Sequence, residues 1–150
     1  MNSILIVDDE PRIRALLVRW LEEAKYHTRQ APDAETGLQM MESECADEVF
    51  CDVEMPGNGG LWLIERLREE FPDTPTVLAT AVDSIPPSLT LQGGVVNYLV
   101  KPFNRQGVLD AVSQSLKWRE RATAQRFSQN SKANTVDAWL DNVEIKAPEN

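Results

Sequence analysis

The sequence predicts an α/β domain with a five-stranded parallel sheet that is covered by helices on both faces. Between residues 4 and 117, short apolar runs alternate five times with segments that favour helices, most of them with apolar residues at helical spacing. The runs are largely free of alternating polar residues, as expected for strands that are buried on both faces. The length of 150 residues is common for one domain.

The first half of the chain predicts three strands and three helices. The strands are expected at residues 4–7, 26–31 and 47–51, and the helices at 11–24, 34–43 and 60–71. Pro11 suits the first turn of a helix, and Asp33 is a good cap for the next one. The run at 26–31 is partly polar, which favours an edge position in the sheet.

The second half predicts strands at 76–81 and 95–100 and a helix at 105–117, with four apolar residues on one face: Val108, Leu109, Val112 and Leu116. A fourth helix is expected at 83–92, but the pattern there is poor. Pro86 and Pro87 fit only its start, and Gly93 and Gly94 end it. We therefore expect this helix to be short or shifted.

Residues 121–150 form a C-terminal extension or linker that is expected to be helical in part. The segment either continues the helix at 105–117 or forms a short separate helix after a cap at Thr135. A docked helix, a linker cut from a longer protein and a disordered end all remain open.

Composition excludes several classes of function. The formal net charge is −9, and all of this excess lies in residues 1–118, which argues against direct binding of nucleic acid. The chain has neither a transmembrane run nor a signal peptide, so no membrane contact and a cytoplasmic location are expected. Cys45 and Cys51 do not have the spacing of a redox pair or a zinc site.

Charged residues follow several predicted strands, where ligands bind in open α/β sheets. Asp8 and Asp9 follow the first strand, Asp52 the third and Lys101 the fifth. Three adjacent carboxylates repel one another unless a cation joins them, and Mg²⁺ prefers such oxygen ligands. A carboxylate can also act as a nucleophile and form an aspartyl phosphate. Lys101 and the hydroxyl of Thr80 would then bind phosphoryl oxygens.

Five motifs in this order resemble the receiver domain of two-component response regulators. They are Asp8-Asp9, Asp52 followed by Met55-Pro56-Gly57, Thr80-Ala81, Tyr98, and Lys101-Pro102-Phe103. The resemblance covers residues 3 to about 120, which we take as a receiver domain at 1–120. It implies a flavodoxin-like, doubly wound sheet of strand order 2-1-3-4-5.

The resemblance also implies a role for each matching residue. Asp52 would accept a phosphoryl group from a phosphohistidine. Asp9 would bind Mg²⁺ directly and Asp8 through water, with Asp52 and the backbone carbonyl of Glu54 completing the protein ligands. Thr80 and Lys101 would hold the phosphoryl oxygens, and Tyr98 would act with Thr80 as the switch.

The implied partners are a sensor histidine kinase or phosphotransfer protein and a downstream protein or output domain; a homodimer is also allowed. The implied protein is a bacterial phosphoprotein that slowly loses its own phosphate and is not an enzyme. Two alternatives remain: the input domain of a longer signalling enzyme cut near residue 150, and a binding module that is never phosphorylated. An aspartate-nucleophile phosphatase fits neither strand end, because both lack its Asp-x-Asp-x-Thr/Val motif.

Overall fold

The computed structural model describes residues 1–81 and 95–144, and its five strands and four helices agree with the predicted order. The strands are β1 (Ser3–Val7), β2 (His27–Ala31), β3 (Glu48–Asp52), β4 (Thr76–Thr80) and β5 (Val95–Val100). The helices are α1 (Pro11–Glu23), α2 (Ala34–Ser43), α3 (Gly60–Glu70) and α5 (Arg105–Glu144). The helix expected at 83–92 lies outside the described residues.

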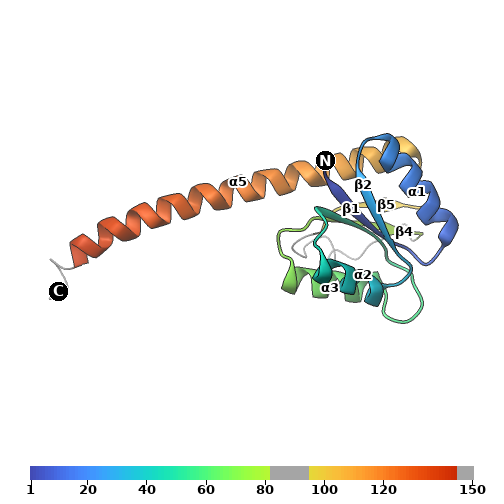
Figure 1. Ribbon diagram of the computed structural model, residues 1–150, viewed down its shortest axis with the longest axis horizontal. Coiled ribbons are helices and arrows are strands. Elements are labelled where there is room, and N and C mark those ends of the chain that lie inside the picture. The colour runs from blue at the N-terminus through green and yellow to red at the C-terminus, as the bar shows by residue number, and fades with distance from the viewer. Residues whose placement is uncertain (82–94, 145–150) are drawn as a thin grey trace. The chain divides into compact units, whose positions relative to one another are not determined.

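The strands form one parallel sheet of order β2-β1-β3-β4-β5, which confirms the predicted fold class (Figure 1). The partly polar β2 lies at an edge, as its sequence predicted. All residues of β3 and β4 are buried, because each strand has a neighbour on both sides and helices above and below.

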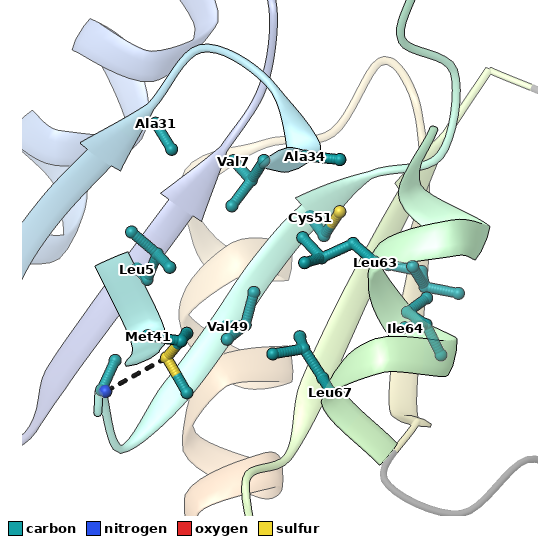
Figure 2. Packing of buried hydrophobic residues seen from close by; sticks show 12 residues of the cluster. Leu5, Val7, Ala31, Ala34, Met41, Val49, Cys51, Leu63, Ile64 and Leu67 are labelled. Atoms are coloured by element: carbon teal, nitrogen blue, oxygen red, sulfur yellow. Dashed lines mark hydrogen bonds between the residues drawn. The ribbon is translucent and has the colours of Figure 1, made fainter. Parts of the chain in front are cut away.

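Alternate residues of the strands face two separate hydrophobic cores. One core lies between the sheet and helices α2 and α3, where Leu63 and Leu67 point toward Val49 and Cys51 of β3 (Figure 2). The other core lies between the sheet and helices α1 and α5, and it contains Phe50, Leu17 and Val112 among others. The period of two along a strand therefore determines which helix pair each strand residue contacts.

Local signals fix the starts of two helices. Pro11 is in the first turn of α1, and the carboxylate of Asp33 accepts a hydrogen bond of 2.7 Å from the backbone N–H of Thr36 at the start of α2. That hydrogen bond lowers the pKa of Asp33. Both features agree with the sequence-based expectations.

Helix α5 begins where predicted but extends to Glu144, well beyond residue 117. The helix therefore runs through the segment after residue 117 without a break at Thr135. Contacts divide the chain into two compact units, Met1–Arg119 and Glu120–Asn150. Within the described ranges, no helix is long and apolar enough to cross a membrane.

Candidate functional site

Four of the predicted site residues lie at the carboxyl-terminal edge of the sheet. Asp8 directly follows β1, Asp52 ends β3, Thr80 ends β4, and Lys101 directly follows β5. These four strands are consecutive neighbours, so their ends meet at one edge. Asp8, Asp52 and Thr80 are buried, with exposed fractions of 1%, 2% and 2%.

Lys101 joins the two buried carboxylates. Its Nζ lies 3.4 Å from Oδ2 of Asp8 and 3.4 Å from Oδ1 of Asp52. The backbone N–H of Lys101 donates to the carbonyl of Thr80 at 2.7 Å, which attaches the loop to β4. The ring of Phe103 packs edge-on against Phe50, with centroids 5.9 Å apart, and so anchors the same loop to the core.

Burial and charge change the pKa values of this group. Burial raises the pKa of Asp52 to about 6, and the charge of Asp8 adds to this, while Lys101 and the backbone N–H of Glu54 oppose it. Burial lowers the pKa of Lys101, but the charges of Asp8 and Asp52 outweigh it and the pKa is raised overall. Lys101 is therefore a cation over the whole physiological range.

A second acidic group lies beside this pair. Ligand oxygens of Asp8, Asp9 and Glu10 lie within 4.8 Å of one another, and only Asp8 is buried. Besides Lys101, two residues of the following segment contact Asp8: its Oδ1 accepts from the backbone N–H of Glu10 at 2.9 Å, and its carbonyl accepts from Nη1 of Arg14 at 2.7 Å. Sequence reasoning missed both Glu10 as a member of this group and Arg14 as a support.

The donor set fits a magnesium ion. Every candidate ligand is an oxygen, and two of the carboxylates, those of Asp8 and Asp52, are buried with Lys101 as the cation between them. Two buried carboxylates facing one lysine leave an excess of negative charge, which a hard divalent cation would neutralise. In the described part of the chain, Asp52 does not belong to the cluster of Asp8, Asp9 and Glu10.

The side chain of Glu54 contacts the site in a way that the sequence did not predict. Oε1 of Glu54 accepts a hydrogen bond of 2.7 Å from the hydroxyl of Thr80, and Oε2 accepts one of 3.3 Å from the backbone N–H of Ala81. Sequence reasoning used only the backbone carbonyl of Glu54. No signal within the loop indicates this contact, because it depends on the exact distance between the ends of β3 and β4.

The loop after Asp52 is held close to the start of α3. A Cβ on Gly60 would lie 2.3 Å from the carbonyl oxygen of Asp52, so only glycine allows this approach. Gly57 adopts a φ of +74°, in the left-handed region that favours glycine. Gly60 therefore allows the close approach between the Asp52 backbone and the start of α3.

Tyr98 lies further from the group. It lies in β5 opposite Leu78 of β4, and Leu78 is two residues before Thr80 in that strand. Tyr98 is 43% exposed. An outward tyrosine on this strand is compatible with the predicted switch role but does not test it.

Comparisons with known proteins point to one family. The family profile described as the response regulator receiver domain matches residues 4–113. The chain is 31% identical over 122 residues to the C4-dicarboxylate transport transcriptional regulatory protein DctD of Pseudomonas aeruginosa, covering 79% of this chain but only 26% of DctD. The chain thus spans about a quarter of that relative's length.

Solved structures agree with this similarity. A CheY-like receiver domain protein from Methanospirillum hungatei superposes with a TM-score of 0.76 at 28% identity, over 81% of this chain and 98% of that one. The response regulator TrrA of Thermotoga maritima, solved in complex with Mg²⁺-BeF, gives a TM-score of 0.69 at 35% identity, over 75% and 97% of the two chains.

Proposed function

The chain belongs to the receiver-domain family of response regulators, and from that premise we propose that it accepts a phosphoryl group on Asp52 from a phosphohistidine. The observation that carries the proposal is the buried pair of carboxylates, Asp8 and Asp52, with Lys101 between them at 3.4 Å from each. This arrangement brings a nucleophile and a fixed cation to one point.

In the proposed reaction, a carboxylate oxygen of Asp52 attacks phosphorus. The bond between phosphorus and the donor imidazole nitrogen breaks, and the nitrogen keeps the electron pair. With a pKa of about 6, Asp52 is mostly ionised at neutral pH and can act as a nucleophile. Such transfers depend on positioning and on neutralising charge at the phosphoryl oxygens.

The residues around Asp52 would supply that neutralisation. Lys101 contributes its ammonium group, Thr80 its hydroxyl and Ala81 its backbone N–H. Asp8, Asp9 and the backbone carbonyl of Glu54 would hold Mg²⁺ together with Asp52. The ion, when bound, neutralises charge on the carboxylates and on the transferring group.

The phosphoryl group would then act as a switch. It adds about −1.5 to −2 charges and strong acceptors, and it favours whichever conformation binds it better. We place Thr80 and Tyr98 in this switch, because both lie at the β4–β5 side of the sheet. The proposed donor is a sensor histidine kinase or phosphotransfer protein, and the receiver of the signal is a downstream protein, an output domain or a second copy.

Family members are generally phosphoacceptors and not catalysts. We accordingly assign no enzymatic turnover to this chain beyond slow loss of its own phosphoryl group. The share of DctD that it matches, 26%, together with the continuation of α5 past Arg119, favours a second candidate: the receiver part of a longer signalling protein.

The test is the intact mass of the protein after incubation with Mg²⁺ and acetyl phosphate. One added phosphoryl group is expected in the wild type, with none in Asp52→Asn and none when Mg²⁺ is chelated. Phosphorylation of Asp52→Asn at the wild-type level would contradict the proposal. Absence of any addition, also from phosphohistidine donors, would favour a binding module that is not phosphorylated.

A further inference from the structure

We propose that the carboxylate of Glu54 is an internal competitor for the donors that would hold the phosphoryl group, so that it favours the unphosphorylated state of the site. The inference rests on the proposed function of Asp52 and concerns its regulation. It assigns a role to the Glu54 side chain, which is separate from the metal role given to its backbone carbonyl.

The geometry behind this inference is a pair of hydrogen bonds across the site. The two oxygens of Glu54 take one donor each: the hydroxyl of Thr80 at 2.7 Å and the backbone N–H of Ala81 at 3.3 Å. A phosphoryl group on Asp52 would need these same donors for its oxygens. The carboxylate of Glu54 thus already occupies the donors that the phosphoryl group would need.

The contact is specific, because Glu54 is not forced into it by burial. Glu54 is an exposed residue, whereas Thr80 is only 2% exposed. An exposed glutamate ordinarily keeps its carboxylate in water, but this one reaches across from the β3 loop to the end of β4. Hydrogen bonds to a charged acceptor are stronger than neutral ones, so the contact stabilises the state in which Thr80 donates to Glu54.

Two consequences follow for a bound phosphoryl group. Glu54 has to leave Thr80 and Ala81 before they can bind it, and the displaced carboxylate remains a nearby negative charge. Both effects weaken binding of a phosphoryl group relative to a site without Glu54. A phosphoryl group shifts the site toward the active state only as far as it binds that state better than the inactive state. Because Glu54 stabilises the inactive state, a larger fraction of phosphorylated protein is needed for switching.

The direct test is the affinity for beryllofluoride, a phosphoryl mimic, measured by calorimetry at saturating Mg²⁺. Replacing Glu54 by alanine is expected to tighten binding by about tenfold, the scale of one charge-assisted hydrogen bond. Glu54→Gln, which keeps an acceptor but loses the charge, is expected between alanine and wild type. Glu42→Gln serves as the control, since it removes the charge of an exposed glutamate of α2 that belongs to neither the acidic group nor the contact with Thr80.

A double-mutant cycle separates competition from simple repulsion. In the Thr80→Val background, Glu54→Ala is expected to tighten beryllofluoride binding by a few-fold at most. The hydroxyl for which Glu54 and the mimic compete is absent there. An equal effect of Glu54→Ala in both backgrounds, or no effect in wild type, would overturn the inference. Mg²⁺ affinity is titrated separately for each variant to exclude a change in metal binding.

The outcomes also distinguish this inference from the proposed function. If beryllofluoride fails to bind wild type and every Glu54 variant, and acetyl phosphate adds no mass, the phosphoacceptor role of Asp52 is wrong and the competition fails with it. If the wild type binds the mimic and Glu54→Ala binds it no more tightly, Asp52 retains its role and only the competition is excluded.

Discussion

Two acidic residues of β3, Glu48 and Asp52, are buried, and their carboxyl groups differ in what surrounds them. Asp52 has Lys101 at 3.4 Å, whereas neither carboxylate oxygen of Glu48 has a hydrogen-bond partner among the described residues. Burial raises the pKa of both, to about 6 for Asp52 and well above the ordinary value of 4.5 for Glu48. Ionisation of either group therefore opposes folding.

Asp52 is expected to reduce the stability of the metal-free protein at neutral pH. Its folded-state pKa of about 6 exceeds the ordinary 3.8, so stability falls as pH rises from about 4 to about 6. Asp52→Asn cannot ionise and should raise the free energy of unfolding at pH 7 by roughly 2–3 kcal/mol. Urea unfolding without Mg²⁺ measures this difference.

The matched control for Asp52→Asn is the same measurement with saturating Mg²⁺. A bound cation favours the carboxylate, so the difference between wild type and variant should shrink. A variant that is less stable than wild type at pH 7 in the absence of Mg²⁺ would contradict this account of Asp52.

Glu48 is expected to make stability depend on pH in the same direction. Below the ordinary value of 4.5 both states are protonated, and above it the unfolded state loses its proton first, so stability falls with rising pH. The stability of Glu48→Gln relative to wild type should therefore increase as the pH rises above about 4.5, the ordinary value of a glutamate. Thermal unfolding at several pH values measures this slope.

Glu42→Gln provides the comparison for Glu48→Gln, because Glu42 is an exposed residue of α2. Its stability should follow that of wild type at every pH. Parallel curves for Glu48→Gln and wild type would mean that the buried carboxyl group ionises without cost to the fold.

Single residues show how far the sequence alone predicts the site. The sequence alone was enough to predict that four residues lie at one edge of the sheet, because the carboxyl ends of parallel strands share an edge. These are Asp8, Asp52, Thr80 and Lys101. The side-chain contact of Glu54 with Thr80 could not be predicted in this way, since it depends on the exact distance between two neighbouring strands. The buried position of Glu48 was equally hidden, because a charged residue at the start of a strand normally predicts exposure.

At the scale of elements, apolar runs and helical spacing predicted every strand and helix that the structure describes, within one or two residues at most ends. The main exception is the end of α5, which lies at Glu144 where the apolar spacing predicted residue 117. Apolar spacing indicates where a helix can pack on a core, and it does not by itself mark the residue at which the helix ends.

The junction of β3 and α3 is expected to tolerate no side chain at Gly60. A Cβ there would lie 2.3 Å from the carbonyl oxygen of Asp52 and 2.8 Å from Cα of Val53, so the backbone would have to shift. Gly60→Ala should lower the free energy of unfolding by about 1–3 kcal/mol, the usual cost of overpacking, and weaken beryllofluoride binding.

Gly57→Ala is the matched control for Gly60→Ala. Gly57 has a φ of +74°, but nothing lies within 4 Å of the position of its Cβ. Its substitution should cost only about 1 kcal/mol, from backbone strain, with little effect on the site. Equal losses for the two variants would show that the close approach at Gly60 has no special importance.

At the scale of the whole molecule, residues Met1–Arg119 form a unit that contains both cores and the site. We expect a chain ending at Arg119 to fold with nearly the full stability of this unit and to bind beryllofluoride and Mg²⁺ as the full chain does. Arg119 should remain, because its Nη1 lies 2.6 Å from Oδ1 of Asp47, the residue directly before β3. Calorimetric unfolding and mimic binding measure both properties.

A chain ending at Leu109 is the comparison for this truncation. It lacks Val112 and Leu116, which are buried in the core between the sheet and helices α1 and α5. It should fail to fold cooperatively. Loss of folding in the longer truncation as well would mean that the receiver unit depends on residues after Arg119.

Of the predicted properties of this site, the one on which the others depend is that Asp52 carries the phosphoryl group. The most direct measurement is to locate the group by peptide mapping after phosphorylation with acetyl phosphate and Mg²⁺ and reduction of the acyl phosphate with borohydride. We expect conversion at Asp52 alone. Conversion at Asp8 or Asp9 with Asp52 unmodified would contradict it.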